Sequence, residues 1–383
     1  GGRSVIYLDS AATSFFRPPE VLEAVAGAMT SFGNPSRGGC GPSLLASRTV
    51  FQAREALNRL FDGDGPEQVA FTANSTESLN LAIKGLLKPG ELAVSTIMEH
   101  NSVLRPLYEM EGQGAKLLLA GCDEKGRLLY EDLEEKIRRG AKLAVVTHAS
   151  NVTGNRNDLR RIGKICRETG TLLIVDASQT AGIFPISMKE DNIDVVCFTG
   201  HKSLMGPQGT GGLCVRKGVE IRPLLSGGSG ILTFEKEHPS AMPVRLEAGT
   251  LNTHGIAGLL AGVRYLMEEE RWKNFQEKEL RLAELFYREL KDCPKFIFYG
   301  DPAGGLRVPV ISLNLREEDS GEVSDWLFHE YGICTRPGGH CAPLMHEFFH
   351  TERQGMVRFS FSHGNTEEEV RRAAAALREM TEQ

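Results

Sequence analysis

Three polar clusters follow three short apolar runs in the middle of the chain. The clusters are His148-Ala149-Ser150-Asn151, Asp176-Ala177-Ser178-Gln179 and Thr199-Gly200-His201-Lys202. Ligands of open α/β sheets bind beyond the carboxyl ends of the strands. Polar turn residues follow many strands for purely structural reasons, but three such clusters in succession indicate one site at one edge of a sheet.

The chemistry at this edge is suggested by Lys202 and Asp176. A lysine amine can condense with an aldehyde, and an aspartate can keep a pyridine nitrogen protonated so that the ring accepts electrons. Pyridoxal phosphate needs both groups. We therefore expect Lys202 to hold this cofactor covalently and Asp176 to pair with its ring nitrogen.

A phosphate site is indicated by the segment Ala73-Asn74-Ser75-Thr76-Glu77-Ser78, which follows the apolar run VAFT and opens a helical pattern. Backbone N–H groups and the hydroxyl of Thr76 could bind the phosphate there. The same residues also fit an ordinary helix cap, and both readings can hold together. His100 follows another apolar run, where it could stack on the cofactor ring and transfer protons.

The elements that must position these residues follow from the apolar pattern. Seven short runs alternate with segments of helical spacing and predict a mostly parallel sheet with helices on both faces. The runs are 69–73, 91–96, 116–120, 142–147, 171–176, 194–199 and 211–215.

A second pattern follows a segment without period, 223–243, which we expect to be a long loop. A helical pattern then spans about 254–291, followed by a strand at 308–315, a helix near 320–330, a strand at 357–362 and a final helix opened by Asn365. These alternations predict a smaller α+β domain.

Composition excludes several classes of protein. The chain has 383 residues, 41% hydrophobic residues and a formal charge of −6, so a large core can form and no basic footprint for nucleic acid is present. The eight cysteines form no CxxC pair, which favours a reducing compartment. No apolar run is long enough for a membrane span. We expect a cytoplasmic protein that binds neither nucleic acid nor membrane.

Ten strings resemble the class V aminotransferase family and, within it, the cysteine desulfurases. They are IYLDSAAT, NPSRG, STESLNLAIKG, MEHNS, HASNVTG, VDASQ, TGHKSLMGPQGTGGL, EAGTLNT, RPGGHCAP and VRFSFSHGNTEEEV. The resemblance extends from Tyr7 to about Val370. The pattern Arg-x-Gly-x-His-Cys-Ala resembles the group II branch, which also contains the selenocysteine lyases.

This resemblance implies an α/β type I pyridoxal phosphate fold with a seven-stranded, mostly parallel sheet. It implies a large cofactor-binding domain at 15–252 and a small domain, carrying the cysteine loop, at 1–14 and 253–383. It also implies a homodimer with active sites at the subunit interface.

The resemblance also assigns roles to individual residues. Lys202, Cys341, His100 and Asp176 match catalytic residues, and Cys341 matches the nucleophile. Asn151, Arg358 and Arg336 match substrate-binding residues, with Arg358 expected on the carboxylate. The cofactor-binding matches are Ser75, Thr76, His100, Asn151, Asp176, Gln179, Thr199, His201, Lys202 and Thr250, the last reaching the phosphate of the other subunit.

The implied reaction converts L-cysteine into L-alanine and leaves the sulfur on Cys341 as a persulfide. An acceptor protein or a small thiol would then take the sulfur, for example for iron–sulfur cluster assembly. Selenocysteine lyase, cysteine sulfinate desulfinase and other C–S lyase reactions remain alternatives. A scaffold that binds the cofactor without turnover is disfavoured, because Lys202, Asp176, Arg358 and Cys341 are all present.

One competing motif is His346-Glu347-Phe348-Phe349-His350, which fits the H-E-x-x-H pattern of zinc hydrolases. On a helix this spacing would place two imidazoles on one face. No third ligand is evident in the sequence, and we therefore expect no metal site.

Overall fold

The large sheet has seven strands in the order β2-β8-β7-β6-β5-β3-β4 in a computed structural model that describes residues 4–36 and 38–383. All seven predicted runs form strands, and β8 alone runs opposite to the other six. The strands are β2 (Val69–Thr72), β3 (Leu92–Thr96), β4 (Lys116–Ala120), β5 (Leu143–Thr147), β6 (Leu172–Asp176), β7 (Val195–Thr199) and β8 (Gly211–Val215).

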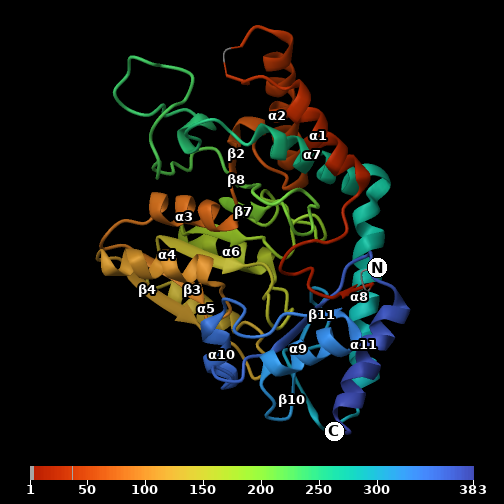
Figure 1. The fold of residues 1–383 in the computed structure, drawn as a ribbon. Coiled ribbons are helices and arrows are strands. Elements are labelled where there is room, and N and C mark those ends of the chain that lie inside the picture. Colours follow the sequence, from red (N-terminus) through yellow and green to blue (C-terminus); the bar gives the residue numbers. More distant parts are fainter. Residues whose placement is uncertain (1–3, 37) are drawn as a thin grey trace.

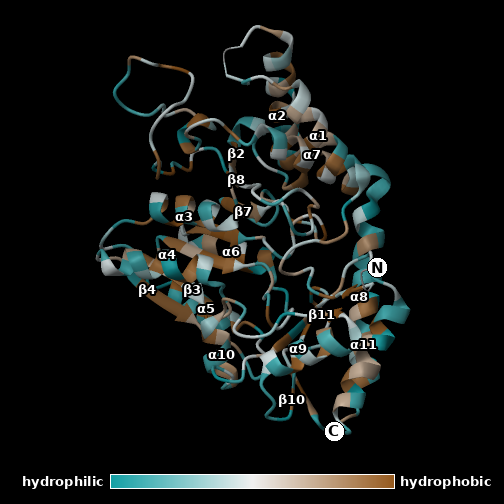
Figure 2. Cartoon of the chain, in the orientation of Figure 1, coloured by the Kyte–Doolittle hydropathy of each residue, from teal (hydrophilic) through white to brown (hydrophobic). Residues whose placement is uncertain are grey.

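Helices cover both faces of this sheet, as predicted. Side chains alternate along each strand, so Val145 packs with α3 and α4, whereas Val146 packs with α5 and α6. Figure 2 shows the apolar strands between these helices. The four helices are α3 (Ser75–Leu86), α4 (Asn101–Gly112), α5 (Tyr130–Ile137) and α6 (Leu159–Thr169).

Three further helices pack together beside β2 and β8 (Figure 1). They are α1 (Pro19–Ser31), α2 (Gly41–Leu60) and α7 (Thr253–Met267), and the short 3₁₀ helices η1 (Pro66–Gln68) and η2 (Val244–Leu246) lie near β2. Neither α1 nor α2 was expected from the sequence pattern. Leu259 and Val263 of α7 belong to the core of the large sheet.

The helical pattern predicted for 254–291 is broken in the middle. A 3₁₀ turn, η3 (Glu268–Glu270), separates α7 from α8 (Arg271–Leu290), and Glu269 and Glu270 have a φ of 52°. Three consecutive carboxylates lie at the start of α8, where the helix dipole favours negative charge. Figure 1 shows α8 running from the large sheet to the smaller unit.

The smaller unit has its own sheet and core, which confirms the predicted α+β pattern. The antiparallel order is β12-β10-β9, and Phe286 of α8 packs with Phe359 and Phe361 in the core. Its elements are β9 (Phe296–Tyr299), β10 (Val310–Leu315), α9 (Ser320–Tyr331), β12 (Val357–Ser360) and α11 (Glu367–Met380), with β1 (Ile6–Tyr7) paired in parallel with β11 (Ile333–Cys334). Helix α10 (Pro343–Phe349) instead packs through Met345 into the core of the large sheet. The domain limits at 14/15 and 252/253 stay a prediction.

Segment 223–243 contains neither helix nor strand, as predicted, and it projects from the body near α2 (Figure 1). Among the helices of the described residues, none combines the length and the apolar character that crossing a membrane requires.

Candidate active site

A cleft lies beyond the carboxyl ends of β3, β5, β6 and β7, where the sequence analysis placed the site. It contains about 570 Å³ of space free of protein atoms. Nine of the predicted site residues line it: Ser75, Thr76, His100, Asn151, Asp176, Gln179, Thr199, His201 and Lys202. The fold thus brings together residues from five separate segments of the chain.

Lys202 and Asp176 form the charged centre of the cleft. Burial, together with the positive charge of Arg358, lowers the pKa of Lys202 to about 8, although the Asp176 carboxylate opposes this shift. Asp176 Oδ1 accepts hydrogen bonds from Ser178 N at 3.1 Å and Ser178 Oγ at 2.6 Å. Near neutral pH a minor fraction of Lys202, far larger than for an ordinary lysine, is therefore an uncharged, nucleophilic amine.

His100 is fixed as the first residue before α4. Its Nδ1 accepts a hydrogen bond from the backbone N–H of Ser102 at 3.0 Å. The other ring nitrogen, Nε2, takes no part in this cap. Burial lowers the pKa of His100, although the Asp176 carboxylate opposes this shift. A neutral imidazole at this place can stack on an aromatic ring or pass a proton.

Hydroxyl groups gather at the amino end of α3. Thr76 Oγ1 is 2.9 Å from Ser102 Oγ, and Thr199 Oγ1 is buried without a hydrogen-bond partner. Burial lowers the pKa of His201 to about 4, so its ring is neutral near pH 7. An unpaired buried hydroxyl beside a helix amino end suits a phosphate, and these residues fit the phosphate of pyridoxal phosphate.

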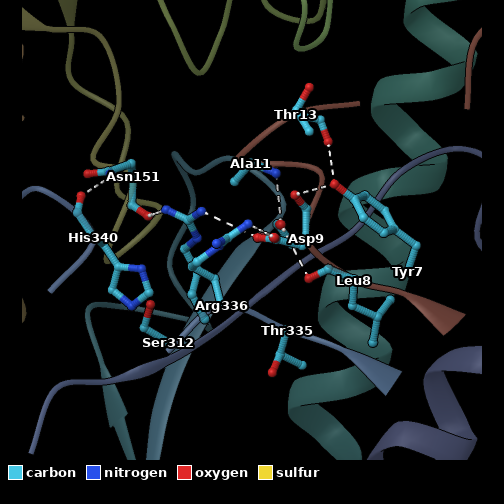
Figure 3. A network of polar contacts seen from close by, with 12 residues as sticks. Tyr7, Leu8, Asp9, Ala11, Thr13, Asn151, Ser312, Thr335, Arg336 and His340 are labelled. Carbon is cyan, nitrogen blue, oxygen red and sulfur yellow. Dashed lines mark hydrogen bonds and ion pairs between the residues drawn. The ribbon is translucent and has the colours of Figure 1, made fainter. Parts of the chain in front are cut away.

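Arg358 and Arg336 both face Asp9, as Figure 3 shows for Arg336. Arg336 Nη2 donates to Asp9 Oδ2, and Arg358 Nη2 lies 3.6 Å from Asp9 Oδ1. The two arginines are also joined by backbone hydrogen bonds of 3.2 and 2.8 Å. Burial lowers the pKa of Arg358 to about 10 and Asp9 raises it, so the guanidinium stays charged.

The free edge of Arg358 differs from that of Arg336. Arg358 is 4% exposed, its Nη1 donates to the carbonyl oxygen of Asn151 at 3.3 Å, and its Nε has no partner. Half of the Arg336 side chain is exposed. Arg358 is therefore the better preorganised group for a planar carboxylate.

Cys341 lies at the rim of the cleft on a loop that is held at several points. Asn151 Nδ2 donates to the carbonyl oxygen of His340 at 2.8 Å, and Asn101 N donates to that of Cys341 at 2.6 Å. His340 and Cys341 have φ angles of 54° and 53°, which cost about 1 kcal/mol or more each and persist only where neighbours fix them.

The thiol of Cys341 combines exposure with closeness to the cleft. The residue is exposed and shares a surface groove with Thr76 and His100, which also line the cleft. Its negative charge as a thiolate raises the pKa of Lys202 and of Arg358. None of the eight cysteines, all within the described residues, is in a disulfide.

Thr250 is the one predicted site residue that lies elsewhere. It is exposed and lines a second hollow together with Ser36 and Gly228. Within one chain this hydroxyl does not reach the cleft, so a role in the cofactor site needs a second subunit.

The H-E-x-x-H spacing does not produce a pair of imidazoles on one helix face. His350 terminates α10 with a φ of 59°, and His346 Nδ1 is 2.8 Å from Thr351 Oγ1. Across the described ranges, no group of three or more histidine, cysteine or acidic side chains could hold a metal ion.

Two contributors were missed by the sequence analysis, Asp9 and Ser178. Asp9 lies in the quoted string IYLDSAAT, directly after the short strand β1, but nothing local marks it as the partner of two arginines. Ser178 lies in the second polar cluster, where its spacing from Asp176 fits a turn that folds back on a carboxylate.

Comparison with known proteins places the chain in a family. Residues 6–373 match the aminotransferase class-V family, and the chain belongs to it. Its relatives include a probable cysteine desulfurase of Methanothermobacter thermautotrophicus, 31% identical over 99% of this chain and 95% of that protein. Another is a probable cysteine desulfurase of Pyrococcus abyssi, 33% identical over 99% of this chain and 94% of that protein.

Solved structures agree with this membership. The apo cysteine desulfurase of Thermococcus onnurineus NA1 superposes with a TM-score of 0.91 at 32% identity, over 98% of this chain and 94% of that chain. A cysteine desulfurase of Escherichia coli gives a TM-score of 0.87 at 27% identity, over 99% and 95%. The expected fold and family are confirmed, whereas membership of group II stays a prediction.

Proposed function

We propose that this chain is a pyridoxal phosphate-dependent cysteine desulfurase that releases L-alanine and keeps the sulfur on Cys341. The observation that carries the proposal is a buried lysine of lowered pKa beside Asp176, in a cleft with an exposed cysteine at its rim. The family membership and the names of the full-length relatives support it.

Lys202, Asp176, His100, Thr76 and Thr199 would hold the cofactor. When bound, pyridoxal phosphate supplies an aldehyde for the amine and a ring that accepts electrons from the substrate Cα. Ser75, Gln179, Asn151 and His201 complete the wall of this cleft.

Arg358 would bind the substrate carboxylate along its unpaired edge and so place the substrate between Lys202 and Cys341. The uncharged amine of Lys202 takes the proton from Cα. The Cys341 thiolate attacks the substrate sulfur, the S–S bond forms and the Cβ–S bond breaks. The electron pair of that bond passes to Cβ, where one proton completes the methyl group, and a second proton returns to Cα to give alanine.

The thiolate, not the thiol, is the nucleophile. A free cysteine thiol has a pKa of about 8.5 and is therefore mostly protonated, and unreactive, at neutral pH. The Cys341 thiolate and the Arg358 guanidinium interact electrostatically. The exposed position of Cys341 leaves the resulting persulfide open to an acceptor thiol, on a protein or a small molecule.

The same arrangement could act on selenocysteine or cysteine sulfinate, which are the alternative substrates. Cys341 favours sulfur transfer over β-lyase or aminotransferase chemistry on the same cofactor, since neither elimination nor amino transfer needs a thiol. We further propose a homodimer in which Thr250 of one subunit meets the phosphate site of the other, and a cytoplasmic role in sulfur supply for iron–sulfur clusters.

Borohydride reduction of the yellow protein tests the cofactor site. We expect the reduced adduct on Lys202 and its loss in Lys202→Ala. An adduct on another lysine, such as Lys142, would contradict the assignment. Each candidate amino acid is then assayed for alanine together with sulfide or selenide, which separates the substrate alternatives.

A further inference from the structure

A second cavity lies against Lys202 and is lined mostly by residues that the proposed reaction does not use. We call it the rear cavity, and it is lined by Lys202, Gln179, Ser10, Ser203, Glu279 and His363 among others. The space that the centres of water molecules can reach inside it is about 40 Å³. This is room for a few waters and too little for an amino acid substrate.

Glu279 is the unexplained group in this cavity. It lies on α8, is 5% exposed, and has no hydrogen bond or ion pair among the described residues. The hydroxyl of Ser10, which lines the same cavity, is buried without a partner as well. Buried polar groups in native proteins almost always have a partner, and ordered water is the usual one where protein atoms supply none.

Two titratable side chains close to Glu279, His363 and Lys278, form no ion pair with it. His363 is stacked on Phe275 with ring centroids 3.8 Å apart, and burial lowers the pKa of His363 to about 4, so it is neutral. Lys278, the neighbour on α8, donates to the carbonyl oxygen of His363 at 2.6 Å. Burial raises the pKa of Glu279 to about 8, although Lys278 lowers it. Glu279 is therefore a carboxylic acid near neutral pH.

The proposed reaction leaves a proton to be supplied. Lys202 takes one proton from Cα, but both Cβ and Cα must gain one before alanine is complete. A second proton must therefore reach Lys202 within each turnover, and the proton that Cys341 releases to solvent balances it. Lys202 is the one residue that the proposed reaction uses and that also lines the rear cavity with an ionisable side chain.

We propose that Glu279 is a positioning acid that exchanges a proton with Lys202 through water held in the rear cavity. The acid O–H gives its proton to a cavity water, and that water gives one of its own protons to Lys202 Nζ. Glu279 remains as a carboxylate until a proton returns from solvent. No bond to carbon or sulfur changes and nothing is oxidised. Since Lys202 and Glu279 have similar pKa values, transfer between them is nearly balanced.

The first test is infrared difference spectroscopy of the cofactor-free protein, wild type minus Glu279→Gln. We expect the C=O band of a protonated carboxylic acid at pH 7 and its loss as the pH rises through about 8. A carboxylate band at pH 7 in its place would overturn the proposal. Because no cofactor is present, this result does not depend on the proposed function.

The second test is the pH dependence of kcat in the cofactor-loaded enzyme. We expect Glu279→Gln to lower kcat about 10-fold to 100-fold at pH 7 with little change in KM, the low range of general acid catalysis. The loss should shrink above about pH 8, where wild-type Glu279 is already ionised. A loss that stays constant with pH, or no loss, would overturn the relay.

The matched control is Glu277→Gln, an exposed glutamate two residues earlier on the same helix, which should leave kcat unchanged at every pH. Glu279→Asp keeps the acid and serves if the glutamine variant folds poorly. It should retain the protonated-acid band and part of the pH-dependent rate, and loss of both would overturn the proposal. An enzyme without desulfurase activity would contradict the proposed function and leave the infrared result valid.

Discussion

Arg358→Lys tests how the substrate carboxylate is bound. The substitution keeps the positive charge but replaces a planar fork of donors with a single point charge. Arg358 is 4% exposed, and two of its nitrogens already face Asn151 and Asp9, at 3.3 and 3.6 Å. Its Nε has no partner, so the edge that would meet a carboxylate cannot be reproduced by an ammonium group.

The expected magnitude follows from one lost charge-assisted hydrogen bond, about 1.5–3 kcal/mol. This corresponds to a fall of about 10- to 100-fold in kcat/KM for L-cysteine. Since Arg358 binds the substrate before the chemical steps begin, most of the fall should appear as a raised KM. Steady-state production of alanine gives both constants.

Arg336→Lys is the matched control, because Arg336 pairs with the same Asp9 from the neighbouring strand position but is half exposed. We expect its kcat/KM to change by no more than a few-fold. Thermal melting of both variants checks that the fold is intact. Unchanged kinetics in Arg358→Lys together with a large loss in Arg336→Lys would refute the assignment and move the carboxylate site to Arg336.

Three further predictions concern the nucleophile, the buried acid and the dimer. Cys341→Ser should bind cofactor and L-cysteine with normal spectra but form no persulfide, because a hydroxyl is a far weaker nucleophile; full alanine production by this variant would contradict the role of Cys341. The raised pKa of Glu279 means that the folded state binds more protons than the unfolded state between about pH 4.5 and 8, so stability falls as pH rises through this window. Glu279→Gln should therefore gain roughly a few kcal/mol over wild type in denaturant unfolding at pH 8 relative to pH 5, and an equal difference at both pH values would argue against a buried neutral acid. Mixing inactive Lys202→Ala with inactive Thr250→Arg should restore part of the activity, since one site in each mixed dimer regains a complete set; no recovery in a demonstrated heterodimer would show that each chain builds its own site.

Much of the fold was predictable because the large sheet is buried on both faces. Its strands are therefore continuous apolar runs, and every one of the β5, β7 and β8 residues is buried. Polar residues at the ends of such strands stand out, which is why nine site residues could be named before the cleft was seen.

The remaining features depend on tertiary contacts that leave no local pattern. β1 has two residues, too short for a period, yet it carries the chain to Asp9. The positive φ of Cys341 is fixed by distant residues, among them Asn101. Glu279 has the spacing of an ordinary helix carboxylate, and only the packing of α8 shows that it is buried and unpaired.

The persulfide on Cys341 can be observed by mass spectrometry of the protein after brief incubation with L-cysteine. We expect one additional sulfur atom on the peptide that contains Cys341, with alanine formed in equal amount, and neither product in Lys202→Ala. Sulfur on another cysteine, or alanine formed while Cys341 stays unmodified, would contradict sulfur transfer to Cys341.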